Sequence, residues 1–349
     1  MKRKHQIKIV VVLIVAVLLF GGLYITMRQM EKQYFSADKT KDQQTRTEEK
    51  PEAFQTDVVR GKVKLDGKKY TFSHEIETYL LIGTDASGNQ KATGEDYRGT
   101  MADFLLLAVV DRTEESYAFL QLNRDTMTRI HLIGTDGTGE ATAKLQLCTA
   151  HWYGGTRAQS CENTVKAVSQ LLGGIPIDGY YELNMEQIPA LNKAVGGVTV
   201  TIQDDFSKID STMKQGTTIT LTDEQAYTYV HDRYGVGDEE NTSRMKRQRQ
   251  YMENFLKKAQ KLSSQDANFI VDLYKQLEEA AETDITGKQT SRLANRIRRY
   301  ENKGILSLEG TTKLGQALGD GIDHTEFYPD KQSLIDTMVQ LYSLKCEEE

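Results

Sequence analysis

Three apolar runs decide the fold: YLLIG at residues 79–83, FLLLAVV at residues 104–110 and YAFLQL at residues 117–122. Their composition and length predict buried β-strands. A charged turn, residues 111–115, separates the second run from the third and predicts an antiparallel hairpin. Helical patterns fill the intervals between these and later apolar runs. We therefore expect an α/β domain, layered around a mixed central sheet.

Charged residues stand at the ends of these predicted strands. Asp85 follows the first strand, Asp103 precedes the second and Arg124 follows the third. In a hairpin the start of one strand lies beside the end of the next, so Asp103 and Arg124 should be neighbours. Asp85 joins them if the first strand runs parallel to the third. Two carboxylates and an arginine suit a hard divalent cation that shares a phosphate, although aspartate at strand ends is also ordinary turn chemistry.

A second group of polar residues lies on two predicted helices further along the chain. A capping box opens the first helix at residues 222–225, and the second runs from about residue 242 to residue 262. The candidate residues at their ends are His231, Arg233, Arg244, Arg247 and Gln248. Gln248 falls on the apolar stripe of its helix, where a buried amide needs a partner. Converging arginines predict a phosphate site, and a solvated basic helix face is the alternative.

The N-terminal region predicts where the domain works. Residues 9–27 follow a basic cluster and contain no charged residue, and as a helix they would span about 28 Å, close to the bilayer core of about 30 Å. The positive-inside bias makes residues 1–8 a cytoplasmic tip, 9–27 a single-pass anchor in the cell membrane, 28–60 an extracytoplasmic stalk and 61–349 the folded domain. A cleaved signal peptide is the alternative, but no A-x-A-like site ends the apolar run.

Net charge and cysteine content limit the partners and the redox chemistry. A net charge of −6 argues against nucleic acid as a partner. Cys148 and Cys161 flank a loop-like stretch, and a disulfide between them would stabilise the fold by about 3 kcal/mol outside the membrane. Two buried thiols are the alternative. No cysteine or histidine has the spacing of a structural zinc site.

The order of these segments resembles the LytR-CpsA-Psr family of Gram-positive cell-wall proteins, over nearly the whole domain from about Tyr79 to Leu344. LLIGTD at residues 80–85 looks like the family's opening strand and aspartate, ADFLL at 102–106 like its second aspartate motif, and NRDT at 123–126 like its R-D-T element. The other segments in the family's order are YGG at 153–155, residues 180–184, VGGVTV at 195–200, AYTYVHDR at 226–233 and RMKRQ at 244–248.

This resemblance implies a three-layer α/β/α fold whose core cavity takes a polyprenyl chain. It also implies transfer of a glycan phosphate from undecaprenyl pyrophosphate to peptidoglycan, onto a muramic acid 6-hydroxyl, at the lipid bilayer. Asp85 and Asp103 would organise Mg²⁺ (or Mn²⁺), and one of them would accept the hydroxyl proton. The implied pyrophosphate-binding residues are Arg98, Arg124, His231, Arg233, Arg244, Arg247 and Gln248. The glycan could equally be teichoic acid, capsule or another wall polymer.

Three positions depart from the family pattern. The family usually has arginine two residues before the second aspartate, where this chain has Met101, with Arg98 nearby as a substitute. His231 replaces the first arginine of an R-x-R pair, and histidine with an ordinary pKa of about 6.5 is mostly uncharged at neutral pH. Asn241 replaces an aspartate. Each change removes fixed charge, which leaves two alternatives to transfer: a non-catalytic binder or regulator of lipid-linked or wall glycans, and a polyprenyl pyrophosphate hydrolase.

Overall fold

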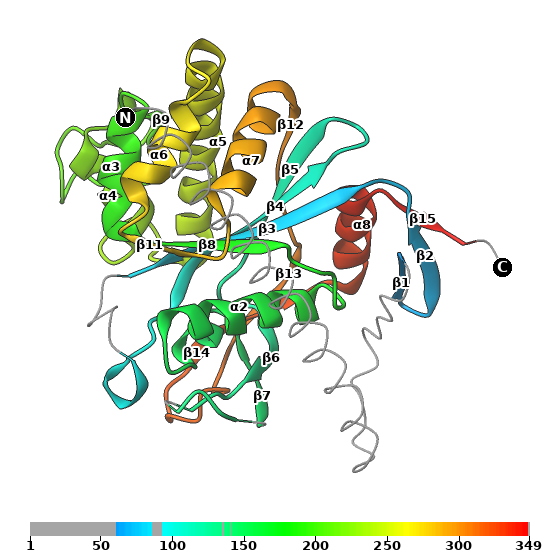
Figure 1. Ribbon diagram of the computed structural model, residues 1–349. Coiled ribbons are helices and arrows are strands. Elements are labelled where there is room, and N and C mark those ends of the chain that lie inside the picture. The colour runs from blue at the N-terminus through cyan, green and yellow to red at the C-terminus, as the bar shows by residue number, and fades with distance from the viewer. Residues whose placement is uncertain (1–60, 86–92, 135, 140, 348–349) are drawn as a thin grey trace, which may run out of the picture. The chain divides into compact units, whose positions relative to one another are not determined.

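The computed structural model describes residues 61–85, 93–134, 136–139 and 141–347 (Figure 1). The predicted cytoplasmic tip, anchor and stalk, residues 1–60, lie outside the described residues. Within the described ranges, no helix is both long enough and apolar enough to cross a bilayer.

A mixed six-stranded sheet organises the domain, with the strand order β11-β8-β3-β4-β5-β12. β3 (Ile76–Thr84), β4 (Ala102–Asp111) and β5 (Ser116–Leu122) are antiparallel neighbours, so the three apolar runs and their hairpin are confirmed. β8 (Gly179–Asn184) runs parallel to β3, and β12 (Glu301–Ser307) runs parallel to β5. β11 (Ala281–Thr283) completes the edge beside β8. The predicted α/β class with a mixed central sheet is confirmed.

Helices pack on both faces of this sheet, which explains why its central strands are apolar at consecutive positions. Alternate residues such as Leu80 and Leu107 belong to a core shared with α2 (Arg157–Leu171) and α8 (Lys331–Tyr342). Their chain neighbours, such as Leu106, pack with residues of α5 (Asn241–Gln265) and α7 (Gly287–Arg299). Successive side chains of a strand point to opposite faces, so each run serves two cores.

A third apolar cluster lies beside the sheet and positions the two helices, α4 and α5, that carry the second group of candidate residues. It includes residues of β9 (Thr199–Thr201), α4 (Asp223–His231) and α5, with α6 (Phe269–Leu277) packed against it. β10 (Thr218–Thr220) pairs with β9, and α3 (Ile188–Ala194) precedes them. The predicted capping box opens α4, because Thr222 and Gln225 each accept from the other's backbone amide.

The remaining elements are short. β1 (Lys62–Leu65), β2 (Lys68–Phe72) and β15 (Leu344–Cys346) form one small sheet. Two hairpins are formed by β6 (Met127–His131) with β7 (Thr142–Gln146) and by β13 (Gly310–Gly315) with β14 (His324–Pro329). The 3₁₀-helices are η1 (Gly94–Asp96), η2 (Leu147–Trp152) and η3 (Met185–Gln187). After residue 263 the chain forms the helices α6, α7 and α8 and the strands β11 to β15.

The expected disulfide between Cys148 and Cys161 is also wrong: both thiols are free and buried. The Cys148 sulfur lies 3.3 Å from Nη2 of Arg124, whereas the Cys161 sulfur lies 3.6 Å from Nε2 of His151. The stretch between the cysteines is helix η2 followed by the start of α2, and both are packed into the core. It is therefore not the loose loop that a disulfide would constrain.

A buried ion pair connects α2 to the sheet, next to the end of β3 that precedes Asp85. Nε of Arg157 donates to Glu182 at 2.5 Å, and the hydroxyl of Thr84 donates to the other carboxylate oxygen, also at 2.5 Å. The Glu182 side chain is 1% exposed. Because Thr84 directly precedes Asp85, this pair anchors the end of β3.

We predict that Arg157→Met lowers the free energy of unfolding by about 3–5 kcal/mol, because it leaves the Glu182 carboxylate buried without a cation. Urea unfolding of the purified protein measures the change. The double variant R157M/E182L should recover most of the loss, since it removes the buried charge as well. A double variant no more stable than R157M would contradict this electrostatic explanation.

Candidate functional site

The sheet brings Asp103 and Arg124 together at one edge, as the hairpin predicts. β3 and β5 both pair antiparallel with β4, so the ends of β3 and β5 lie beside the start of β4. Nη1 of Arg124 donates to Oδ1 of Asp103, and Nη2 of Arg244 from α5 lies 3.4 Å from the same oxygen. The Asp103 side chain is only 5% exposed. One buried carboxylate therefore faces two guanidinium groups.

Several positively charged groups lie close together at this edge of the sheet. Burial, and then the neighbouring charges of Arg124 and Arg233, lower the pKa of Arg244 to about 10. Nε of Arg124 and Nε of Arg244 are buried and have no hydrogen-bond partner among the described residues, although Nε of Arg124 lies 3.5 Å from Oδ1 of Asp125. Buried donors are almost always paired in native proteins. Arginines that crowd together with unpaired donors are the arrangement expected where an anion binds.

His231, at the end of α4, connects Asp85 to the cluster. Its Nε2 lies 3.0 Å from Oδ1 of Asp85 and its Nδ1 lies 2.9 Å from Oδ1 of Asp232, while its ring stacks on Tyr227. The hydrogen bond to Asp232, then the one to Asp85, raises the pKa of His231 to about 9. His231 is therefore positively charged at neutral pH. This corrects the expectation that the replacement of arginine by histidine removes a charge here.

Asp85 belongs to the same electrostatic group. Its hydrogen bond with His231, together with the charges of His231, Arg244 and Arg124, holds the pKa of Asp85 below its usual value. Its side chain is 48% exposed, unlike that of Asp103. The two predicted carboxylates thus differ in access: Asp103 is enclosed by arginines, and Asp85 faces outward.

Asn241 occupies a position where an amide makes contacts that a carboxylate could not make. Its Nδ2 donates to Oδ2 of Asp125 at 2.8 Å and to Oδ1 of Asn123 at 3.1 Å, and its Oδ1 accepts from Nη2 of Arg244 at 2.9 Å. A carboxylate has no N–H to donate and would repel Asp125. Asparagine in place of aspartate therefore fits the hydrogen bonds at this position. Burial raises the pKa of the neighbouring Asp125 carboxyl.

Met101 contributes no charge, but its sulfur contacts the site. Nη2 of Arg124 is directed at Sδ of Met101 and at Sγ of Cys148. Two sulfur atoms thus occupy one side of the guanidinium group. Arg98, the predicted substitute, is exposed, and its Nη1 donates to the Tyr97 carbonyl at 2.8 Å. The phosphate-binding role of Arg98 stays a prediction.

The guanidinium group of Arg247 makes its contacts inside the protein. It pairs with Asp204 and donates to the carbonyls of Tyr229 at 2.9 Å and Asp232 at 2.5 Å. Its side chain is 1% exposed, so it holds the end of α4 against α5. Arg233, by contrast, stacks on exposed Tyr234 with 4.7 Å between its guanidinium carbon and the ring centroid.

An apolar cavity of about 240 Å³ adjoins the charged edge. Leu81, Phe104, Leu191, Met252, Phe255 and Leu256 are among its lining residues. Gly83 and Gln248 also line it, and Nε2 of Gln248 donates to the Val230 carbonyl at 3.1 Å. Phe104 directly follows Asp103, and Val230 directly precedes His231. The cavity and the charged cluster are therefore built from the same short segments.

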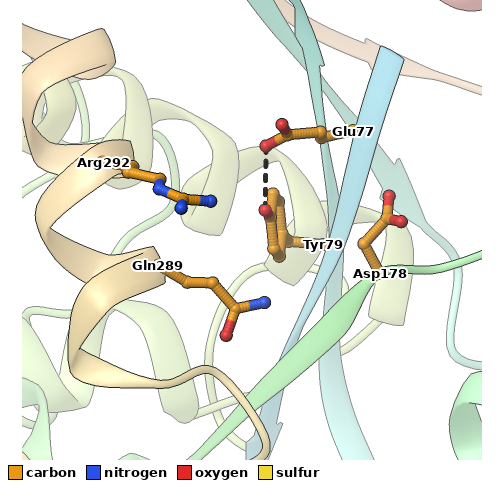
Figure 2. A pocket seen from close by; sticks show the side chains of 5 residues that line it. All are labelled: Glu77, Tyr79, Asp178, Gln289 and Arg292. Carbon is orange, nitrogen blue, oxygen red and sulfur yellow. Dashed lines mark hydrogen bonds between the residues drawn. The ribbon is translucent and has the colours of Figure 1, made fainter. Parts of the chain in front are cut away.

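A second, polar cavity of about 220 Å³ lies at the other end of β3 (Figure 2). Glu77 and Tyr79 from β3, Asp178, and Gln289 and Arg292 from α7 line it. The Tyr79 hydroxyl donates to Glu77 at 3.0 Å. Since Asp85 lies at the opposite end of this strand, the polar cavity is separate from the candidate site.

Metal binding by protein groups alone is not supported by the described residues, where no three histidine, cysteine, aspartate or glutamate side chains are arranged to hold an ion. Asp85 and Asp103 are the two carboxylates that the sequence predicts for a metal site at this edge. Several contributors were not foreseen from the sequence: Asn123, Asp125, Asp204 and Asp232. Asn123 and Asp125 contact Asn241, and Asp204 contacts Arg247, across long separations in the chain that residue spacing does not reveal. Asp232 contacts its chain neighbour His231.

The family model LytR_cpsA_psr matches residues 25–341. The chain belongs to the LytR_cpsA_psr family. The resemblance that the motifs of the sequence indicate is thereby confirmed, and the Asp85, Asp103, Arg124 and Arg244 cluster lies within the matched region.

Several relatives of this chain are 26–30% identical to it over the aligned residues. The polyisoprenyl-teichoic acid–peptidoglycan teichoic acid transferase TagU of Halalkalibacterium halodurans is 30% identical over 187 residues, covering 53% of this chain and 54% of that protein. Biofilm regulatory protein A of Streptococcus mutans is 28% identical over 206 residues, covering 57% and 48%. TagU of Bacillus cereus strain ATCC 14579 is 26% identical over 249 residues, covering 71% and 72%. The match spans about half the length of the first two relatives.

Solved structures share the fold of this family member. Protein gbs0355 from Streptococcus agalactiae superposes with a TM-score of 0.61 at 23% identity, covering 78% of this chain and 90% of that one. B. subtilis TagV gives a TM-score of 0.56 at 22% identity, covering 78% and 97%. TagT bound to LIIa-WTA also gives 0.56 at 22% identity, covering 77% and 90%.

We predict that His231 titrates with a pKa of about 9, measured from the pH dependence of its ring NMR signals. Asp85→Asn and Asp232→Asn should each lower this pKa, because each removes a negative hydrogen-bond acceptor. The folded pKa lies above the unfolded value of about 6.5, so the stabilisation is complete below about pH 6.5 and is lost as the pH rises through about 9. A wild-type pKa near 6.5 would contradict the charged state.

Proposed function

We propose that this protein transfers a glycan phosphate from a polyprenyl pyrophosphate carrier to peptidoglycan. The observation that carries the proposal is the junction between an apolar cavity and a buried arginine cluster with unpaired donors. A polyprenyl pyrophosphate has the same two parts, an apolar chain and a dianionic head. The printed names of the TagU relatives, polyisoprenyl-teichoic acid–peptidoglycan transferases, support the same donor and acceptor.

In the proposed reaction, the acceptor hydroxyl attacks the phosphorus that carries the glycan. The bond from this phosphorus to the bridging oxygen breaks, a bond to the acceptor oxygen forms, and polyprenyl phosphate leaves. Asp85 takes the hydroxyl proton, because its side chain is exposed enough to meet an incoming acceptor. Asp103 instead orients Arg124 and Arg244 toward the donor.

The arginine cluster stabilises the charge that develops during this transfer. Arg124 and Arg244 offer fixed donors in a largely buried setting, where their interaction with phosphate oxygens is stronger than in water. Arg233 lies close enough to lower the pKa of Arg244 and adds a third guanidinium group. His231 adds a further positive charge at neutral pH and holds Asp85 in place. Positive charge thus remains at the edge despite the three departures from the family pattern.

The oxygen donors also fit a hard cation. Mg²⁺ (or Mn²⁺) commonly binds one or two carboxylates together with substrate phosphate oxygens, and here Asp85 and Asp103 would supply the carboxylates. When bound, the ion would neutralise part of the charge on the pyrophosphate.

We further propose that the chain is anchored in the cell membrane by residues 9–27, with its N-terminus cytoplasmic and its domain outside. The support is the apolar run and the basic residues before it. This placement would bring the domain to the leaflet where a lipid-linked donor and the wall are both within reach.

We predict that Asp103→Ala lowers the rate of transfer roughly 10²–10³-fold, because the arginines lose the carboxylate that orients them. The assay combines full-length protein in detergent with a lipid-linked glycan, peptidoglycan fragments and Mg²⁺, and measures the phosphodiester product by mass spectrometry. Lys257→Ala, an exposed change on α5, is the matched control. Free glycan phosphate as the wild-type product would indicate a hydrolase, and equal product from both variants would exclude the proposed role of Asp103.

We also predict that Met252→Trp raises KM for an undecaprenyl donor about tenfold, a loss of about 1.4 kcal/mol, because the larger side chain fills the cavity. A geranyl donor, which needs less of the cavity, should keep its KM. Lys257→Trp, on the exposed side of the same helix, controls for the added indole. Equal effects on both donors would count against the cavity as the prenyl site.

A further inference from the structure

Every residue that lines the polar cavity at the far end of β3 carries a polar group. Glu77 and Tyr79 belong to β3, Asp178 lies just before β8, and Gln289 and Arg292 belong to the first turns of α7. The proposed transfer uses none of them. The volume of about 220 Å³ is smaller than the roughly 300–1,000 Å³ of sites for drug-sized ligands, so the cavity suits a smaller molecule.

The charge of Glu77 is balanced within the protein. Arg296 pairs with its carboxylate, Nε of Arg112 lies 3.7 Å away, and the Tyr79 hydroxyl donates to it at 3.0 Å. Burial opposes ionisation, but the hydrogen bonds from Arg296 and Tyr79 hold the pKa of Glu77 below its usual value. Because the Tyr79 hydroxyl proton is directed at Glu77, the lone pairs of its oxygen remain available as acceptors.

Asp178 has no such cation. Its Oδ2 accepts from the Thr78 amide at 2.7 Å, and within the described part of the chain no ion pair involves its carboxylate. Partial burial raises the pKa of Asp178 despite this hydrogen bond, and the negative charge of Glu77 acts in the same direction. A positively charged group beside Asp178 would therefore be stabilised.

The opposite wall of the cavity offers hydrogen-bond donors. Figure 2 shows Gln289 and Arg292 pointing from α7 toward Tyr79. Oε1 of Gln289 accepts from the Thr286 amide at 2.8 Å, as part of the capping box that opens α7, which leaves the NH₂ group of this side chain to donate. Among the described residues, neither this NH₂ group nor the Arg292 guanidinium has an acceptor or an ion-pair partner.

The mixed charge of the lining selects the class of ligand. A metal cation would be repelled by Arg292 and by Arg296, and a simple anion such as phosphate would be repelled by Glu77 and Asp178. A ligand that carries one charge of each sign, each next to the opposite charge of the protein, avoids both repulsions. Guanidinium and carboxylate groups also match in geometry, since they form paired hydrogen bonds.

We propose that this cavity binds a small zwitterion of the amino-acid type. Its ammonium group donates to Asp178 and to the Tyr79 hydroxyl oxygen. Its carboxylate accepts from Arg292 and Gln289. The site does not depend on the proposed transfer function, because Asp85 lies at the opposite end of β3. Free amino acids and short peptides both offer an ammonium and a carboxylate group, and the experiment separates these two sources.

The first measurement is a thermal-unfolding screen of the full-length protein in detergent. The probes are L- and D-amino acids and dipeptides, because a ligand that binds the folded protein raises Tm. We expect at least one of these zwitterions to raise Tm, and its N-acetyl and amide derivatives, which each lack one charge, to raise Tm less at the same concentration. A rise with free amino acids or with dipeptides alone identifies the source. No rise with any zwitterion would overturn the inference.

The second measurement is calorimetric titration of variants with the zwitterion that raises Tm most. D178N keeps an oxygen for the Thr78 amide but removes the charge, and R292M removes the guanidinium from an exposed position. Each should weaken binding about tenfold, as expected for the loss of a hydrogen bond to a charged group. D272N and R298M, at exposed positions of α6 and α7, are the matched controls and should bind as wild type does. Wild-type affinity in both D178N and R292M would overturn the inference.

The derivatives assign the two ends of the ligand. Binding of the amide, which keeps the ammonium group, should weaken in D178N and not in R292M, and binding of the N-acetyl derivative should show the reverse pattern. The opposite assignment would contradict the proposed orientation. Asp103→Ala should bind the zwitterion as wild type does, so a failure of the transfer function and a failure of this inference are distinguishable.

Discussion

The carboxylate of Asp103, buried between two arginines, is the interaction on which the site depends. Burying charged groups costs several kcal/mol for each ion before their attraction is counted, so they stay buried only if the surrounding structure holds them together. The β4–β5 hairpin brings Arg124 to the carboxylate, and α5 brings Arg244. One carboxylate cannot neutralise both. The carboxylates of Asp125 and Asp85 also act on these two arginines.

The groups around this cluster keep its members in fixed positions. Asn241 bridges Asp125 to Arg244, and His231 bridges Asp85 to Asp232. Arg247, whose side chain is buried, donates to the carbonyl of Asp232 and so holds the loop that follows His231. Without any one of these bridging side chains, the charged groups that it connects could move apart. We expect this to disturb the geometry of the site more than the free energy of unfolding.

The sequence predicts the parts of this arrangement that follow from local geometry. Strands buried on both faces appear as unbroken apolar runs, so β3, β4 and β5 could be located, and the hairpin alone makes Asp103 and Arg124 neighbours. β12 and β13 could not be located in this way, because they are polar and partly exposed, and β12 pairs with β5 across a long separation in the chain. Arg244 and Arg247 look alike in sequence, one turn apart on one helix. Asp204, from a distant loop, and the carbonyls of Tyr229 and Asp232 give Arg247 its internal partners.

The same tertiary contacts explain why the departures from the family pattern are less severe than they look in the sequence. Histidine in place of arginine would lose charge in water, but two carboxylate partners raise the pKa of His231 to about 9. Asparagine in place of aspartate would lose a negative charge, but the amide satisfies a buried aspartate and an arginine together. At Met101, however, nothing restores the charge: the thioether only contacts the guanidinium of Arg124. The site is therefore weaker in fixed charge at one position, on the side of Arg124.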